Sequence, residues 1–401
     1  MRRPSSEVLK KPAPYGPDID LEAYEVGKPE VGGPESAPPS ILGTAPERLG
    51  IDASRASYVQ VNELALYKAM ERSLARYGVR VIPLALALRD SGLARELAWR
   101  IVDPETDKYT AYAYEHGGEL GYFIFVPPGT KLPTPIYSCL AITSNRRAQL
   151  AHNVIYVGES SEVHVVTGCA VPHGVREGLH IGVSEFYVGR GARLTFSMIH
   201  AWAEGLHVRP RTAVKVEEGG EFVSYYVIYS PVASLQTFPR VELERSARLY
   251  SASVIAGSGS GIYDVGSKAV LAGEGSSAEI ISRVVARDNS RVFSRAEIVG
   301  KGRETRGHVE CLGLLLSRGS AITSIPEITS ESLEARLSHE AAIGMLAQEE
   351  LEYLMSKGFS EDEAKSVLVR GFMSVEAPGI PSVVRAEIDK ILDLIAAHAV
   401  G

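Results

Sequence analysis

The sequence has 401 residues, of which 45% are hydrophobic, so it can bury a large core and is too long for one small domain. The formal net charge is -7 with both signs interspersed, which gives no general reason to expect binding to nucleic acid or to a membrane surface. No apolar run is long enough to cross a bilayer and no hydrophobic signal core follows the N-terminus, so a cytoplasmic protein is expected.

The N-terminal part of the chain divides into a proline-rich stretch and a helical stretch. Residues 1–50 hold nine prolines and no amphipathic pattern, which predicts an extended or partly disordered arm that packs along the body. Residues 51–104 are predicted to be a helical N-terminal segment. One helix is expected over 64–78, where apolar residues at helical spacing lead to a glycine, and a second over 90–101, starting on a capping aspartate. From Thr110 onward the pattern is typical of strands.

The central part, about 105–330, alternates short apolar and β-branched runs with turn-like tetrads. These tetrads recur at intervals of 27 to 31 residues, which is a period typical of a stacked solenoid. Additional turn signals at 258–261 and 288–290 indicate two or more strands and a corner in each repeat. The second residues of the main tetrads are Ser160, Gly191, Gly219, Ser246, Gly275 and Gly302.

The runs after these turns have the composition and alternation of strands, as at 162–166 and 221–229. Because no helical pattern separates them, each strand must stack on the equivalent strand of the next repeat to bury a continuous core. The predicted fold class is therefore mainly β, a parallel β-helix with α-helical N-terminal and C-terminal segments. A large antiparallel sandwich stays open as an alternative, because the identity between repeats is weak.

A C-terminal helical domain is predicted over 331–401, where the apolar period changes from two to three or four residues. One helix ends at Gly358. The next begins with a capping box formed by Ser360 and Glu363, and a last helix is expected from about Pro381. The exposed face of the first two helices is acidic, so this helix-turn-helix unit does not have the character of a DNA reader.

The densest set of metal-capable side chains lies at the end of the repeats, at His308, Glu310, Cys311, His339 and Glu340. Imidazole, carboxylate and thiolate groups ligate transition metals, and ligands from separate turns of a solenoid need no short sequence motif. A structural role stays open for two of them. Cys311 would then be a small buried strand residue, and His339 a histidine at a helix entrance that bonds to the backbone.

The three cysteines, Cys139, Cys169 and Cys311, are far apart and odd in number, which does not suit a disulfide framework. Without a Cys-x-x-Cys motif, the chain alone cannot supply the four thiolates of an ordinary iron–sulfur or structural zinc site. Cys169 lies beside glycine and proline at a predicted corner, where exposure and reactivity are expected more often than in mid-strand. A small residue that fills a tight turn is the open alternative.

No catalytic signature is present: the chain has no Gly-x-Ser-x-Gly elbow, no phosphate-binding loop and no paired-carboxylate pattern. An independent enzyme is therefore not expected, nor is a nucleotide bound by this chain. Since a β-helix does not fix function, a carbohydrate-active protein or a structural interaction protein without metal stays open at this point.

Six segments of the chain are distinctive. They are Gly178-Leu-His-Ile-Gly-Val-Ser-Glu-Phe, Gly205-Leu-His-Val-Arg-Pro-Arg-Thr, Glu310-Cys-Leu-Gly-Leu-Leu-Leu-Ser, Leu337-Ser-His-Glu-Ala-Ala-Ile-Gly, Glu349-Glu-Leu-Glu-Tyr-Leu-Met-Ser-Lys-Gly and Glu363-Ala-Lys-Ser-Val-Leu-Val-Arg-Gly-Phe. With them the chain resembles the SufB/SufD family, in particular its archaeal members, over about residues 100–375. That resemblance implies a right-handed parallel β-helix that pairs with a SufB/SufD paralogue or with a second copy of itself. It also implies a SufC-type ABC ATPase as partner and a scaffold role in cluster assembly, with a transient iron–sulfur cluster or iron shared with the partner chain.

The resemblance also implies roles for single residues. His339 stands in a serine–histidine context similar to that of the SufD interface, whereas Glu340 matches the SufB pattern, and both are implied to hold a nascent cluster or iron between subunits. Cys169 aligns with a SufB cysteine implicated in receiving sulfur. Ser320 stands where SufB has the thiol thought to hold the nascent cluster, so the interface is nearer to that of SufD.

The C-terminal helical pair is expected to dock the ATPase, since this is the part of the family that binds SufC. Its amphipathic helices also carry more apolar residues than one contact with the last turn should bury. The partner-binding residues expected are Glu349, Leu351, Tyr353, Leu354, Val367 and Phe372.

Overall fold

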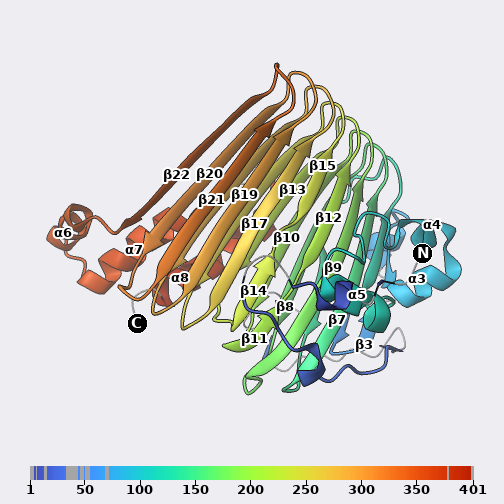
Figure 1. Ribbon diagram of the computed structural model, residues 1–401, viewed down its shortest axis with the longest axis horizontal. Helices are drawn as coiled ribbons and strands as arrows, with labels where there is room; N and C mark the ends of the chain where they lie inside the picture. Colours follow the sequence, from blue (N-terminus) through green and yellow to red (C-terminus); the bar gives the residue numbers. More distant parts are fainter. Residues whose placement is uncertain are drawn as a thin grey trace.

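The structure, a computed structural model, describes residues 4–5, 7–12, 16–32, 44–45, 49, 55–67, 72–376 and 379–398. Its body is a parallel β-helix of about 8 turns with helices at both ends (Figure 1). Every described strand pair from β5 to β22 is parallel. The predicted fold class is therefore confirmed, and the alternative of an antiparallel sandwich is wrong.

Two long sheets form the walls of the solenoid and enclose its lumen. Sheet I contains β1 (Glu30–Val31), β2 (Ala56–Val61), β3 (Leu64–Tyr67), β6 (Ile136–Ala141), β8 (Glu162–Ala170), β10 (Arg193–Ala201), β13 (Glu221–Ile228), β16 (Arg248–Gly257), β18 (Ser277–Ala286), β20 (Arg306–Leu315) and β22 (Arg336–Met345). Sheet II contains β4 (Arg80–Pro83), β5 (Tyr122–Val126), β7 (Arg147–Val157), β9 (Glu177–Val188), β11 (Gly205–Val208), β12 (Arg211–Val216), β14 (Ser234–Thr237), β15 (Arg240–Leu243), β17 (Ile262–Leu271), β19 (Arg291–Gly300) and β21 (Ala321–Ser330).

The helices lie at the ends and on the outside of the two sheets (Figure 1). They are the 3-10 helices η1 (Val8–Lys10) and η2 (Leu21–Ala23), then α2 (Arg72–Ala75), α3 (Leu84–Asp90), α4 (Gly92–Leu97), α5 (Lys108–Gly117), α6 (Gln348–Ser356), α7 (Glu361–Met373) and α8 (Ser382–His398). None of the described helices has both the length and the apolar character that crossing a bilayer requires.

The turns lie where the sequence period predicts them. Five of the six predicted second residues adopt a left-handed backbone, with φ between 56° at Ser246 and 69° at Gly275. Successive turns also stack, because the Gly191 N–H donates to the Glu218 carbonyl at 2.9 Å and equivalent bonds join the other turns. Only the last position is wrong, since the left-handed residue there is Glu304.

Three apolar clusters hold the elements together. The largest fills the lumen between the two sheets, with Ile228 and Val265 among its fully buried members. A second joins the outer face of sheet I to α7 and α8, and a third joins α3, α4 and α5 to the outer face of sheet II. Since burial of apolar area is the main stabilising term, these helices act as covers for two otherwise exposed sheet faces.

Two helix predictions in the N-terminal part are confirmed only in part, since α2 and α4 lie within the predicted stretches but the predicted starting residues are wrong. The stretch predicted as a helix from residue 64 begins instead with β3, which pairs antiparallel with β2 through a turn at Asn62, whose φ is 52°. Asp90 ends α3 and does not cap the next helix; Ser91 does, through its side chain and the Ala94 N–H at 3.3 Å. Only a part of the predicted arm over 1–50 lies within the described residues, and there β1 pairs with β3.

The strand pattern predicted from Thr110 onward is confirmed by β5 and β6 but is wrong for its first part, because residues 108–117 form α5. Asp107 caps this helix by accepting hydrogen bonds from the Tyr109 and Thr110 N–H groups, both at 3.0 Å. The Thr110 hydroxyl completes a capping box with the Asp107 N–H at 3.0 Å. A side-chain cap of this strength outweighs the weak strand preference of the alternating tyrosines.

At the C-terminal end the solenoid continues past the predicted boundary at residue 330, because β22 reaches Met345 and pairs along its whole length with β20. The three helices predicted beyond it are confirmed as α6, α7 and α8. Ser360 and Glu363 form the predicted capping box at the start of α7, and α8 begins next to Pro381 with its apolar residues buried on sheet I.

Candidate functional site

The inner face of sheet I collects most of the residues that the sequence singled out. Side chains alternate between the two faces of a strand. Residues that are aligned on neighbouring strands therefore point to the same face and lie next to each other. Cys169 is aligned with His200, and Cys311 with Ser282, all on the face that lines the lumen. His339 is aligned with Val309, which belongs to the core of the lumen. Three candidates from distant turns therefore share one inner surface.

Glu340 does not share that surface. It follows His339 directly in β22, so strand alternation sends the two side chains to opposite faces. Glu340 is aligned with Glu310 on the outer face, where Glu310 forms an ion pair with Arg283. The two side chains therefore do not face each other, and their predicted role at an interface with a partner chain stays a prediction. The alternative that placed His339 at a helix entrance is wrong, because His339 lies within β22.

His308 is also on the outer face, where its Nδ1 lies 2.9 Å from the Ser338 Oγ. The five clustered candidates thus divide between two faces of the sheet. Among the described residues, no group of three or more histidine, cysteine, aspartate or glutamate side chains is arranged to hold a metal ion.

Cys169 is buried within β8, which corrects the expectation of an exposed corner; only 1% of it is exposed. Its Sγ lies 3.8 Å from the Met198 Sδ on the next turn. Burial raises the pKa of this thiol well above its ordinary value, with the nearby Cys139 adding to the effect. At neutral pH the group is therefore a protonated thiol, and it needs access and a base before it can react as a thiolate.

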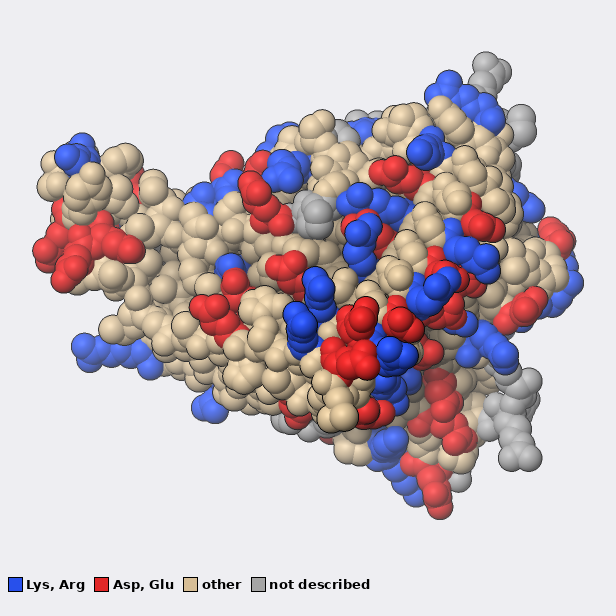
Figure 2. Space-filling view, turned by 90° about the horizontal axis from the view of Figure 1, so that it is seen from above, with Lys and Arg blue, Asp and Glu red and all other residues tan. Residues whose placement is uncertain are grey.

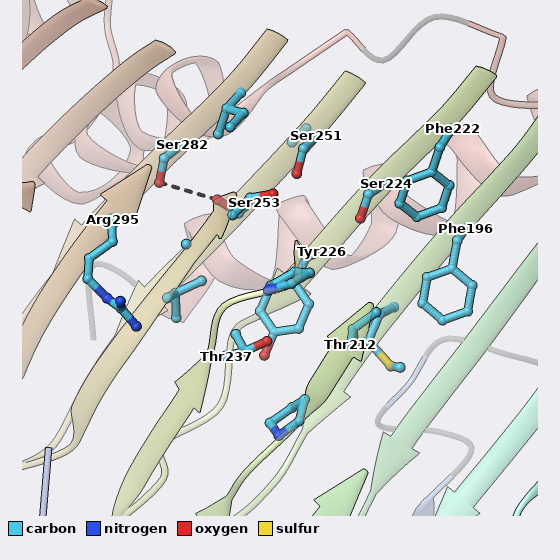
Figure 3. Close-up of a pocket in the computed structure, with 18 of the residues that line it drawn as sticks. Phe196, Thr212, Phe222, Ser224, Tyr226, Thr237, Ser251, Ser253, Ser282 and Arg295 are labelled. Atoms are coloured by element: carbon cyan, nitrogen blue, oxygen red, sulfur yellow. Dashed lines mark hydrogen bonds between the residues drawn. The ribbon is translucent and has the colours of Figure 1, made fainter. Parts of the chain in front are cut away.

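A narrow cavity of about 60 Å³ begins one turn beyond Cys169 and runs through the lumen (Figure 3). A space of this size has room for a few water molecules. Phe196 and Phe222 lie at one side of it, whereas Ser253, Ser282 and Arg295 give the other side a polar character. The core of the lumen is therefore not packed uniformly, because its side chains leave this cavity unfilled.

Buried imidazoles lie at the Cys169 side of this cavity. The Tyr226 hydroxyl and the His200 Nδ1 are 2.9 Å apart, and the His180 Nδ1 lies 3.0 Å from the Gln149 Oε1. Burial lowers the pKa of His180 to about 4 and that of His200 well below its ordinary value, where the neighbouring His180 adds to the effect. Both rings are therefore neutral at pH 7, and burial makes them weak bases.

Hydroxyl groups connect the cavity to Cys311. Ser282 accepts a hydrogen bond from the Ser294 hydroxyl at 2.9 Å, and it lies 3.3 Å from the Ser253 Oγ. The Ser294 Oγ also lies 3.8 Å from the Cys311 Sγ. Cys311 is 2% exposed on a strand, as its structural alternative predicted, and burial raises the pKa of its thiol.

The sequence did not single out Met198, Tyr226, Ser282, Ser294 or Arg295, although they line or extend this inner surface. Nothing in their local motifs distinguishes them. The repeat period was nevertheless a usable signal. Residues one repeat away from Cys169 and Cys311 in the sequence are aligned with them and also face inward. The exact register was needed to read it, since an error of one residue exchanges the two faces.

The C-terminal end of the solenoid is open. Beyond β21 and β22 no further strand pairs with either sheet in the described part of the chain. Apolar side chains are left exposed there, with Ile328 at 39%, Ile343 at 43% and Met345 at 77%. The N-terminal end differs, because the two sheets finish there in the short strands β1 and β4, of 2 and 4 residues. His339 therefore lies at the mouth of the lumen.

The helical pair next to this end is partly exposed, and α6 stands away from the solenoid (Figure 1). Of the predicted partner-binding residues, Glu349, Tyr353 and Val367 are exposed, with Tyr353 at 62%. Leu351 is buried, and Leu354 and Phe372 are intermediate. Figure 2 shows acidic side chains gathered on the lobe at this end of the molecule.

Comparison with known proteins connects this architecture to a function. Residues 140–372 match the family model described as "SUF system FeS cluster assembly, SufBD core domain". An iron–sulfur cluster assembly SufBD family protein of Methanothermobacter thermautotrophicus is 38% identical over 402 aligned residues, which cover 97% of each chain. The chain belongs to the SufBD family. It therefore has a role in iron–sulfur cluster assembly by the SUF system.

Two further relatives are also named as iron–sulfur cluster assembly proteins. A SufBD family protein of Archaeoglobus fulgidus is 41% identical over 317 residues, covering 79% of this chain and 85% of its own. The iron–sulfur cluster assembly protein SufB of Bacillus subtilis is 27% identical over 370 residues, covering 88% of this chain and 78% of its own. The family model spans most of the solenoid and reaches into α7.

Proposed function

We propose that this SufBD chain is a non-catalytic scaffold subunit that pairs through the open end of its solenoid with another SufBD-type chain. The contrast between the two ends of the solenoid carries the proposal. At the N-terminal end the two sheets finish in β1 and β4, of 2 and 4 residues, whereas β21 and β22, each of 10 residues, leave long free edges in the described structure. Free strand edges with exposed apolar residues are sites where a second chain pairs readily.

The partner is a SufB/SufD paralogue or a second copy of this chain. The exposed Ile343 and Met345 supply apolar area that a partner solenoid would cover. Because His339 lies at the mouth of the lumen, pairing places its imidazole at the interface between the two solenoids, here called the joint. The serine–histidine context there supports the SufD position for this chain. Iron and sulfide, as substrates, would meet ligands from both chains at this joint.

Sulfur delivery to that joint is assigned to Cys169. Its thiol lies on the same inner face as His339, and the cavity and the hydroxyls of Ser282 and Ser294 lie between the two. His200 is aligned with Cys169 on the adjacent turn, and its imidazole can accept the thiol proton once solvent access relieves the burial that lowers its pKa and raises that of the thiol. Cys311 is a second thiol on this surface, closer to the joint.

Replacing Ile343 by lysine is expected to abolish pairing, because a charge then lies on the exposed edge that the partner must cover. Light scattering should report the mass of one chain where the parent gives the mass of a pair. His339→Ala should pair normally and give a lower cluster yield after anaerobic reconstitution with ferrous iron and sulfide. Glu217→Lys, in an exposed turn away from the open end, is the control. A parent protein without a partner, or a pairing Ile343→Lys variant, would refute the proposal.

The helical pair α6–α7 is proposed to dock the SufC-type ATPase. Exposed apolar residues, namely Tyr353, Met355 and Phe359, lie beside the acidic side chains Glu349 and Glu352. A surface that combines an apolar centre with charges of one sign suits a partner with a basic rim. Movement of the docked helices would then shift β22, which precedes α6 directly, and with it the cluster joint.

Reversal of both charges, Glu349→Lys with Glu352→Lys, is expected to weaken ATPase binding at least tenfold while the fold stays intact. The physical reason is like-charge repulsion against a basic rim, which costs about 1.4 kcal/mol for each factor of ten. Calorimetry with the purified ATPase measures the affinity, and Glu217→Lys again provides the matched control. Equal affinity of the double variant and the parent would contradict this docking site. If the parent forms neither an ATPase complex nor a cluster, a structural protein without metal is favoured.

A further inference from the structure

A column of charged residues follows the first position of the strands in sheet I. Stacked in register, these residues are Glu162, Arg193, Glu221, Arg248, Ser277, Arg306 and Arg336. In the first half of the column the two signs alternate. Arg193 and Arg248 each lie 3.5 Å from a Glu221 carboxylate oxygen, so Glu221 forms ion pairs with arginines of both neighbouring turns. In this half of the column, opposite charges therefore stand on neighbouring turns.

The second half of the column lacks its carboxylates. Ser277 stands where the alternation calls for an acidic residue, and Arg306 and Arg336 follow on adjacent strands. Both arginines are exposed, and neither forms an ion pair with any residue that the structure describes. Adjacent strands are about 4.8 Å apart, so the two like charges are neighbours. Like charges directly opposite each other are destabilising unless an anion lies between them.

A second column beside the arginines supplies further donors. The His308 Nδ1 lies 2.9 Å from the Ser338 Oγ, which fixes the imidazole and leaves its Nε2 for another partner. These residues line a groove of about 450 Å³ together with Ser277, Arg248, Arg306 and Arg336. Besides the paired Glu221, the acidic residue that lines it is Glu279. Cationic and hydroxyl donors thus converge in one concave surface.

We propose that this groove binds a phosphate group, either as free phosphate or as part of a phosphorylated small molecule. Two guanidinium groups on neighbouring turns present planar N–H forks, which match the paired oxygens of a phosphate. The Ser277 hydroxyl and the His308 ring add shorter-range contacts from the same groove. Since the chain as a whole carries a net charge of -7, the attraction for an anion is local to this groove. This inference does not rest on the proposed pairing or on the ATPase docking.

The test uses the full-length chain and titrates it with orthophosphate in a calorimeter, at an ionic strength held constant with chloride. The parent should show saturable binding. Arg306→Gln and Arg336→Gln should each weaken it about tenfold or more, because each removes a charge-assisted contact. Glu279→Gln should tighten binding by removing the carboxylate from the groove. Arg291→Gln should bind like the parent, since Arg291 starts a strand of the other sheet and is also exposed.

Adenosine monophosphate and adenosine distinguish the two sources of the phosphate. If the nucleotide binds more tightly than orthophosphate and adenosine does not bind, the phosphate belongs to a phosphorylated small molecule; equal affinities indicate free phosphate. Absence of saturable binding by the parent would overturn the proposal. Equal affinities of the Arg336→Gln and Glu279→Gln variants for orthophosphate would also overturn it. If Arg336→Gln changes only the mass of the paired protein, the groove is a contact for an acidic partner chain and the proposal is wrong.

Discussion

Replacing Glu185 by alanine is expected to lower the free energy of unfolding by about 3–5 kcal/mol, because it removes the partner of several buried polar groups at once. Glu185 is fully buried in β9. Its carboxylate accepts hydrogen bonds from the N–H groups of Ile101 at 2.7 Å and Val102 at 3.0 Å, and it lies 2.8 Å from the His152 Nε2. The Trp99 N–H is a further donor.

Urea denaturation monitored by circular dichroism measures this loss, and amide exchange at Ile101 and Val102 tests its origin. The exchange of both amides should accelerate much more than that of distant turns. Glu217→Ala removes a carboxylate from an exposed turn and should change the stability by less than about 0.5 kcal/mol. A Glu185→Ala variant as stable as this control would mean that the buried carboxylate does not fix the segment between α4 and α5.

Ile228→Asp is expected to destabilise the solenoid by about 4 kcal/mol or more, since it places an unpaired carboxylate in the lumen. Ile228 is fully buried on the inner face of β13, aligned with His200 on one side and Ile255 on the other. No cation among these neighbours can pair with the new charge, because His200 is held neutral by its lowered pKa. The urea midpoint of the purified variant, or its failure to accumulate as folded protein, measures the effect.

The conservative change Ile228→Val keeps the site apolar and should cost only about 0.5–1.5 kcal/mol. The difference between the two variants therefore separates the cost of a buried charge from that of a lost methyl group. If Ile228→Asp were no less stable than Ile228→Val, the inner face of β13 would be open to water, in conflict with the burial of this side chain.

The architecture was predictable because its signals are local and repeated. The left-handed backbone at Gly191, Gly219 and Gly275 needs residues of low steric cost, and these recur at the period of the solenoid. The capping box at Ser360 and Glu363 is likewise contained within four residues. Near the N-terminus, where no repeat supports the interpretation, the same kind of reasoning assigned a helix to Leu64–Tyr67, which pairs with β2 instead.

The site was predictable only in part, because it depends on which residues from distant turns share a face. The sequence singled out Cys169, Cys311 and His339, and the register places all three on the inner surface. It also grouped Glu340 with His339, although adjacent strand residues point to opposite faces. The contributions of His200 and Ser294 could not be recognised, since neither belongs to a local motif.

The sequence by itself determined the parallel β-helix, the positions of most turns and the amphipathic helices after it, because turn chemistry and apolar period act over a few residues. Only the tertiary structure decided that the buried Cys169 faces the lumen cavity, that Arg306 and Arg336 stack without a carboxylate, and that the solenoid is open at β22. These features arise from the register between strands about 30 residues apart. Register is set by packing summed over the whole lumen, and no short segment encodes it.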